Sequence, residues 1–293
     1  MEEFALIGNP ISHSKSPALF KAAYQNSVNK ELRESTYTLM QKDNIIDALT
    51  CFLGGNYKGI NITAPFKEQL FSPEVLKLFK EYGFTFLPDK ISSFLRCANI
   101  LVKDNSRKEL RSYNSDYMGV KSIIEIVGKQ KKLIHIAVAG AGGAGKAAAM
   151  AVTDCGIKLT VINRTDMSRF CSEINKELCS KNRLLPLASY CNINDYKSVS
   201  LILSSTNMVI YTIPKEAGNI REQLLAYPQP ILEANYANPS FLKLYKEKEL
   251  YISGKEWLLQ QAIPAFKIFT GTEPNIESMR NYQIHNVGTV GKC

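Results

Sequence analysis

The sequence predicts an α/β protein with two domains, and three observations support this prediction. The chain has 293 residues, whereas one domain usually takes about 100–200. Short apolar, β-branched segments alternate with segments of helical spacing in both halves, as they do in α/β folds. A glycine-rich turn at residues 140–145 directly follows one such strand, which is typical of a nucleotide-binding α/β domain. Two domains also predict a cleft between them.

The first domain is expected over residues 1–115, and its pattern begins with an apolar strand and a proline-initiated helix. Pro17 follows a serine, which is a common start signal for a helix. The expected elements are strands at 4–7, 37–39 and 59–62, helices from 17 and over 44–52, and a hairpin of 100–102 and 110–112 with its tip at 103–108.

The second domain is expected over residues 116–253, entered by a helix from Asp116. Residues 254–293 are expected to pack back on the first domain, with a helix over 257–269 and little periodicity after 275. The other expected elements are strands at 134–139, 158–162, 201–203, 208–211 and 230–232, and a helix from 146.

The charge balance favours small anionic ligands over nucleic acid. The chain has 36 Lys and Arg against 27 Asp and Glu, a formal charge of +9. The basic residues alternate with Glu in expected helical segments such as 76–80 and 242–248, instead of gathering beside aromatic residues. We therefore expect no nucleic-acid partner.

The sequence also predicts a cytoplasmic protein without a membrane span. No run of about 20 apolar residues is present, and the start Met1-Glu2-Glu3 is acidic, unlike a signal peptide. Seven cysteines lack the C-x-x-C spacing of metal or redox sites, so reduced thiols and no metal site are expected.

The glycine-rich turn predicts a Rossmann-type dinucleotide site. After the strand at 134–139, a turn with few Cβ atoms lets backbone N–H groups at a helix N-terminus approach a pyrophosphate. The residues expected to contact the cofactor here are Gly140, Ala141, Gly142, Gly143 and Ala144.

The next strand, at 158–162, ends in Asn163, Arg164 and Thr165, where a Rossmann site reads the ribose. An NAD site places a carboxylate there. A guanidinium instead pairs with a 2′-phosphate, which a carboxylate would repel. The sequence therefore predicts NADP as the cofactor.

Two alternatives for this turn stay open. From Gly140 to Lys146 the chain also reads G-x-x-x-x-G-K, the start of a nucleoside-triphosphate P-loop. That motif needs a Ser or Thr next, to hold Mg²⁺, and this chain has Ala147. The other alternative is a structural turn that binds nothing.

Two serines before the first helix form the first polar cluster. Ser14 and Ser16 can offer hydroxyls to a carboxylate near a helix N-terminus, where the dipole favours an anion. The alternative is that Ser16 only caps that helix.

The second cluster follows the strand at 59–62. Alternation places Asn61 and Thr63 on one side, and Pro65 should start a helix with Lys67 in its first turn. The helix dipole disfavours a cation there, so Lys67 is a candidate general acid or base. A solvated surface lysine is the alternative.

The third cluster combines Asn99 with residues 113–119. Asp116 can cap the helix that enters the second domain. It can also face Lys67 and hold its ammonium group.

Together the clusters resemble the shikimate dehydrogenase family. The matching motifs are G-N-P-I-x-H-S-K-S-P from Gly8, N-x-T-x-P-F-K from Asn61, N-S-D-x-x-G from Asn114, G-A-G-G-A from Gly140 and N-R-T from Asn163. The chain reads Cys97-Ala98-Asn99 in place of the family's A-x-N, and keeps its Asn. A weaker resemblance continues through Tyr236 and Gly254 to Gln261. The family fold has an N-terminal α/β substrate domain and a Rossmann domain.

The resemblance implies reduction of 3-dehydroshikimate to shikimate with NADPH in the chorismate pathway, by a monomer or homodimer. Lys67 and Asp116 would be the catalytic pair, and Gly254 would lie at the cofactor. The residues implied to bind substrate are Ser14, Ser16, Asn61, Thr63, Asn99, Asp116, Tyr236 and Gln261.

The chain departs from the family pattern near the expected nicotinamide. In the glycine-rich turn, the chain has Gly145-Lys146 where the family has Ser-Arg, and the segment 211–214 lacks the family's usual Gly-Met. Later in the chain, Lys255-Glu256-Trp257 replaces the family's Leu-Gly-Met, and Glu233 replaces the usual Asp. Two alternatives stay open. The altered segments 211–214 and 255–257 keep open a catalytically silent sensor of NADP or shikimate. The other alternative is a quinate/shikimate dehydrogenase of broader specificity, which would differ mainly by tolerating an extra hydroxyl on the ring carbon that bears the carboxylate.

Overall fold

The computed structural model describes residues 2–180, 187–214, 220–227, 229–242 and 248–285. The chain divides into two compact units, Met1–Ser115 with Leu258–Cys293, and Asp116–Trp257. The chain re-enters the first unit at Leu258, four residues after residue 254, where the sequence predicted this boundary. The binding roles expected for the two domains stay predictions.

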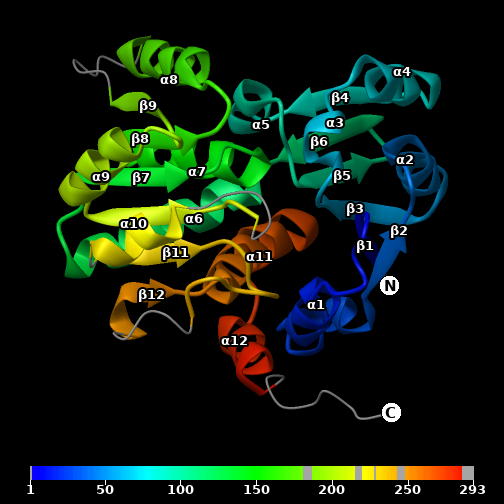
Figure 1. The fold of residues 1–293 in the computed structure, drawn as a ribbon. Coiled ribbons are helices and arrows are strands. Elements are labelled where there is room, and N and C mark those ends of the chain that lie inside the picture. The colour runs from blue at the N-terminus through cyan, green and yellow to red at the C-terminus, as the bar shows by residue number, and fades with distance from the viewer. Residues whose placement is uncertain (1, 181–186, 215–219, 228, 243–247, 286–293) are drawn as a thin grey trace. The chain divides into compact units, whose positions relative to one another are not determined.

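The first unit contains a mixed six-stranded sheet of order β2-β1-β3-β5-β6-β4 (Figure 1). Strand β1 pairs in parallel with β2 and β3, whereas β5 runs antiparallel to β3 and β6. The strands are β1 (Glu3–Gly8), β2 (Thr36–Gln41), β3 (Tyr57–Ile62), β4 (Thr85–Pro88), β5 (Ile100–Asp104) and β6 (Glu109–Tyr113).

Helices pack on both faces of this sheet. They are α1 (Ser16–Gln25), α2 (Ile45–Gly54), α3 (Phe66–Gln69), α4 (Pro73–Glu81), α5 (Lys90–Leu95), the part of α11 (Gly254–Thr270) after Trp257, and α12 (Ile276–His285), with a 3₁₀ turn η1 (Lys30–Glu34).

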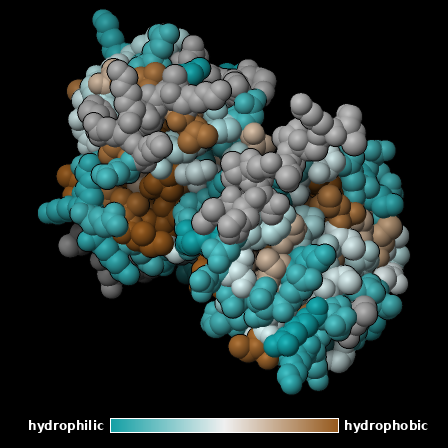
Figure 2. Space-filling view, turned by 90° about the horizontal axis from the view of Figure 1, so that it is seen from below, coloured by the Kyte–Doolittle hydropathy of each residue, from teal (hydrophilic) through white to brown (hydrophobic). Residues whose placement is uncertain are grey.

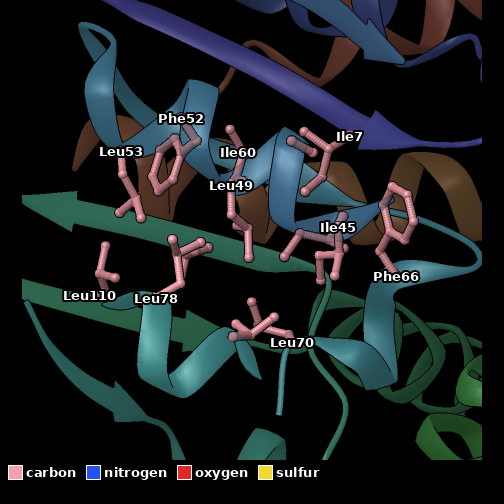
Figure 3. Close-up of a cluster of buried hydrophobic side chains, with 14 of the residues drawn as sticks. Ile7, Ile45, Leu49, Phe52, Leu53, Ile60, Phe66, Leu70, Leu78 and Leu110 are labelled. Atoms are coloured by element: carbon pink, nitrogen blue, oxygen red, sulfur yellow. The ribbon is translucent and has the colours of Figure 1, made fainter. Parts of the chain in front are cut away.

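One face carries the aliphatic core drawn in Figure 3, where side chains of α2 and α4 meet Ile7, Ile60 and Leu110 of the strands. Burying each such side chain is worth about 1.5–3 kcal/mol. The other face carries an aromatic cluster, in which the Phe4 ring stacks on Tyr24 and Phe269.

The second unit contains an all-parallel sheet of order β12-β11-β10-β7-β8-β9. Its strands are β7 (His135–Ala139), β8 (Lys158–Asn163), β9 (Ala188–Asn192), β10 (Met208–Tyr211), β11 (Ile231–Glu233) and β12 (Tyr251–Ile252). Its helices are α6 (Ser115–Gln130), α7 (Gly143–Asp154), α8 (Ser168–Ser180), α9 (Tyr196–Ser205), α10 (Arg221–Ala226), the start of α11, and a 3₁₀ turn η2 (Lys248–Leu250).

One expectation about local structure was wrong. Residues 201–203 are not a strand, since they lie inside α9, whose start is capped by Asp195 accepting from the Ser198 N–H. Residues 276–285 form α12, in which Met279 is fully buried. The expected helical segment 242–248 falls mainly on residues 243–247, which lie outside the described residues, as does the tail from 286.

The surface seen in Figure 2 is mainly hydrophilic, with hydrophobic patches between the polar side chains. Within the described residues, no helix is long and apolar enough to cross a membrane, and no three His, Cys, Asp or Glu side chains are grouped as metal ligands would be.

Candidate active site

Four polar segments meet at one edge of the sheet in the first unit. Strands β1 and β3 are parallel, so their carboxyl ends lie at the same edge. Strand β5 begins there, because Asn61 pairs with Ile100, and β6 ends there, because Ile100 pairs with Tyr113. The loops after β1 and β3, the segment before β5 and the segment after β6 therefore converge.

Asn61, Asn99 and Gln261 are joined by hydrogen bonds at this edge. Asn61 Nδ2 donates to the backbone carbonyl of Asn99 over 3.1 Å. Asn99 Nδ2 donates to Gln261 Oε1 over 3.1 Å and to Ser115 Oγ over 3.0 Å. Asn99 Oδ1 accepts from the backbone N–H of Ser115 at 2.6 Å. The first unit therefore brings together three amides that the sequence predicted as substrate ligands.

The two serines lie at the start of α1. Ser14 Oγ accepts from the backbone N–H of Ser16 over 3.2 Å. The N-cap residue of α1 is Lys15, without a side-chain capping bond, so Ser16 lies inside the helix. The alternative that Ser16 serves only as the cap is therefore wrong. Both serines are half-buried, and their hydroxyls remain candidates for binding an anion.

Lys67 is the second residue of the short helix α3, as expected, with Pro65 as the N-cap residue. Its backbone carbonyl accepts from the Ala98 N–H over 3.1 Å, which ties α3 to the segment that carries Asn99. Thr63 is half-buried, and its N–H donates to the Ile7 carbonyl over 2.9 Å. Both residues therefore lie at the same polar edge.

Asp116 is the second residue of α6 and belongs to the second unit. Because α6 already begins at Ser115, Asp116 is not a cap residue outside the helix. Asp116 is 5% exposed. It directly follows Ser115, whose N–H donates a hydrogen bond to Asn99 Oδ1. The pairing of Asp116 with Lys67 stays a prediction.

In the second unit, the strand order reverses beside β7, where β8 leads one way and β10 the other. Open α/β sheets bind their ligands beyond the carboxyl ends of strands at such a point. The turn here needs its glycines: Gly140 has φ +96°, and a Cβ on Gly145 would lie 2.1 Å from the Gly140 carbonyl oxygen. The Ser of the family pattern would therefore clash at position 145.

Gly142 has a different reason to be glycine. It is the N-cap residue of the 12-residue helix α7, and a Cβ placed on it would meet no atom within 4 Å. Its backbone φ of −71° is one that any residue adopts. Open space at a helix N-terminus fits the approach of a pyrophosphate, so this turn fits a dinucleotide and supports the expected contacts of residues 140–144. Ala147 is fully buried, which leaves no Mg²⁺ ligand for a P-loop.

The end of β8 offers a cation to the ribose side of that site. Asn163 Nδ2 donates to the Thr165 carbonyl over 3.0 Å, which shapes the turn. Arg164 is exposed and makes no ion pair with any residue that the structure describes. A free guanidinium at this position fits a 2′-phosphate.

The loop after β11 contains Tyr236, which is half-buried. The fully buried Glu233 holds the ends of this loop, because its carboxylate accepts from the N–H groups of Ser240 and Phe241 and from the Tyr251 hydroxyl at 2.8 Å. Burial and this carboxylate raise the pKa of Tyr251.

Gly254 is required by packing alone, because a Cβ at this position would lie 2.5 Å from the Ala234 carbonyl oxygen. The contact of Gly254 with the cofactor stays a prediction.

Two residues of the polar edge escaped the sequence interpretation. Tyr37 donates its hydroxyl to Asn61 Oδ1 over 2.7 Å, and Ser115 binds both polar atoms of the Asn99 side chain. Ser115 lies inside the N-S-D motif, so the sequence could have indicated it as a site residue. No local signal marks Tyr37, which lies in an ordinary alternating strand.

Comparisons with known proteins agree with this arrangement. A family model described as the shikimate dehydrogenase substrate binding domain matches residues 6–74. The shikimate dehydrogenase (NADP(+)) of Helicobacter pylori is 30% identical over 286 residues, covering 93% of this chain and 94% of the relative. The enzyme of that name from Archaeoglobus fulgidus is 29% identical, with 94% and 95% covered.

Among solved structures, a quinate dehydrogenase from Corynebacterium glutamicum in complex with NAD has a TM-score of 0.76 at 22% identity, covering 97% of this chain and 99% of that one. This likeness concerns the fold.

An α/β unit with a polar sheet edge, a parallel-sheet unit with a glycine-rich turn, and relatives named as NADP(+) dehydrogenases together indicate a dinucleotide-dependent oxidoreductase. Within that class, the chain belongs to the shikimate dehydrogenase family.

Proposed function

We propose that this protein interconverts 3-dehydroshikimate and shikimate with NADP(H), a step of the chorismate pathway. The observation that carries the proposal is the 30% identity to the Helicobacter pylori shikimate dehydrogenase over 94% of its length. The hydrogen-bonded amides of Asn61, Asn99 and Gln261 support it, because a polyhydroxylated ring needs such groups.

The substrate-binding residues act through hydroxyls and amides. Ser14 and Ser16 bind the carboxylate at the start of α1, where the helix dipole favours an anion, with Tyr236 assisting. Gln261 presents Nε2 to a ring oxygen, since its Oε1 faces Asn99. Asn99 has given both amide hydrogens to protein groups, so it acts toward a ring hydroxyl as an acceptor. Asn61 and Asp116 bind the remaining hydroxyls, and Thr63 lines the site.

Lys67 and Asp116 handle the proton. When bound, the nicotinamide supplies or accepts the hydride at the carbon that bears the reacting oxygen. In the reductive direction, the Lys67 ammonium gives its proton to the developing alkoxide, and in the oxidative direction the neutral amine takes it back. The Asp116 carboxylate positions that amine and binds the neighbouring hydroxyl.

The geometry of the second unit supports the proposed cofactor-binding residues. The backbone of residues 140–144 receives the pyrophosphate at the start of α7. Asn163, Arg164 and Thr165 would hold the 2′-phosphate, with Arg164 as its ionic partner, and Gly254 would contact the cofactor.

The test is a spectrophotometric assay of the purified protein, with shikimate or quinate as substrate and NADP or NAD as oxidant. We expect shikimate with NADP to give the highest kcat/KM. Faster oxidation of quinate would assign the broader specificity instead. Tight binding of shikimate and NADP without any turnover would indicate a sensor and refute the proposed activity.

A further inference from the structure

Tyr37 belongs to the polar edge of the first unit although none of the proposed steps uses it. The strand order β2-β1-β3 places β1 between Tyr37 and Asn61, so the Tyr37 ring reaches across a whole strand to bring its hydroxyl to Asn61 Oδ1 at 2.7 Å. The ring stacks on Phe20 with centroids 4.4 Å apart and an interplanar angle of 14°. The stacking therefore fixes the position of the Tyr37 ring, and the ring fixes the position of its hydroxyl.

The hydrogen bonds of Asn61 fix which way its amide points. The two ends of an amide have nearly the same shape, so their assignment must come from their partners. The backbone carbonyl of Asn99 only accepts, and it lies 3.1 Å from Nδ2. The nitrogen must therefore face Asn99 and the oxygen must face Tyr37, whose hydroxyl must donate.

We propose that Tyr37 is a positioning residue that orients Asn61 for the substrate; the inference rests on the proposed function. Asn61 is half-buried, and the two bonds leave one Nδ2 hydrogen and one Oδ1 lone pair for a ligand hydroxyl. Without the phenol, the amide can turn about its soft terminal torsion. Binding must then order it, so the loss falls on affinity for the substrate and not on the chemical step.

The variant Tyr37→Phe tests this directly, because it keeps the stacked ring and removes only the hydroxyl. We expect KM for shikimate to rise about tenfold, the effect of one ordinary hydrogen bond, with kcat within about twofold. An unchanged KM, or a loss confined to kcat, would overturn the inference.

Tyr24→Phe is the matched control. Tyr24 belongs to the same aromatic cluster, with its ring 6.1 Å from that of Phe20, and its buried hydroxyl has no hydrogen-bond partner among the described residues. Its loss should leave KM unchanged. A tenfold rise in this control as well would show that disturbance of the cluster explains both variants, against a specific role of Tyr37.

A double-mutant cycle shows whether Tyr37 acts through Asn61. In an Asn61→Ala background, Tyr37→Phe should change KM by less than about twofold, because the bond that it removes is already gone. A full tenfold effect in that background would contradict the inference.

A readout without substrate separates this inference from the proposed function. If the wild-type protein does not oxidise shikimate, the proposed function fails. The role of Tyr37 is then judged from the NMR signals of the Asn61 side-chain amide in the ligand-free protein. Tyr37→Phe should shift them and speed their hydrogen exchange; unchanged signals would refute the positioning role.

Discussion

The side-chain amide of Asn99 donates a hydrogen bond to Oε1 of Gln261 over 3.1 Å, although 162 positions separate the two residues in the chain. The bond joins helix α11 to the segment before β5. Asn99 is 3% exposed, and its Oδ1 accepts from the Ser115 N–H at 2.6 Å. This amide therefore ties α11 into the first unit and orients Gln261, a proposed substrate ligand.

Asn99→Ala should lower the free energy of unfolding by about 1–3 kcal/mol, because it leaves a buried N–H of Ser115 without its acceptor. Urea denaturation measures this loss. Asn105→Ala, at an exposed position of the hairpin tip in the same unit, should stay within about 0.5 kcal/mol of the wild type. Equal stability of the two variants would show that the Asn99 bonds contribute nothing.

Arg164→Ala should lower kcat/KM for NADP by about 10- to 100-fold, the range of a charge-assisted bond, and leave kcat/KM for NAD nearly unchanged. Steady-state kinetics with both cofactors measure the ratio. Lys197→Ala removes one positive charge from an exposed helix position in the same unit and should preserve the NADP preference. Equal losses with both cofactors would argue against recognition of the 2′-phosphate.

The buried His135 should make the protein less stable in mild acid. Burial, and then the charge of Lys158, lower the pKa of its imidazole from the ordinary 6.5, and its Nε2 lies 2.9 Å from Thr160 Oγ1. Because the native state binds this proton less readily than the unfolded state, stability is complete above pH 6.5 and falls as the pH drops toward the native pKa. The slope is about 1.4 kcal/mol per pH unit at most.

Urea titrations of His135→Gln between about pH 7.5 and 5 test this slope. The variant should lose part of the acid sensitivity, whereas His13→Gln, at an exposed position, should retain it. A wild-type slope in His135→Gln would assign the acid effect to other groups.

The sequence predicted the parts of this molecule whose signals are local. The strand, glycine turn and helix around Gly140 follow from neighbouring residues, as does the placement of Lys67 in the first turn of α3. The apolar segment 201–203 was misread as a strand because a short apolar run fits either element. Its true signals were the Asp195 cap and the i, i+4 spacing of the buried Val199 and Leu203.

The long-range contacts of the polar edge could not be predicted from local sequence patterns. The resemblance to the family implied roles for Gln261 and Asn99, but only the structure shows that their side chains are hydrogen-bonded to each other. The role of Tyr37 depends on β2 lying one strand away from β3, a matter of topology that no local pattern of residues encodes.

Lys67 is the residue on which the proposed chemistry depends. Lys67→Met keeps a side chain of similar length without the amine. We expect calorimetry to show shikimate binding within about threefold of the wild type, and NADP reduction slower by about 10²- to 10⁴-fold, the usual contribution of a general acid–base group. Lys77→Met, at a position where the side chain is 79% exposed, should leave both quantities unchanged.

The most direct measurement is therefore the rate of NADPH formation from saturating shikimate and NADP by the wild type and by Lys67→Met, compared in one preparation series. We expect rapid turnover by the wild type and a loss of at least about a hundredfold in Lys67→Met. Turnover by Lys67→Met at the wild-type rate would contradict the proposed role of Lys67.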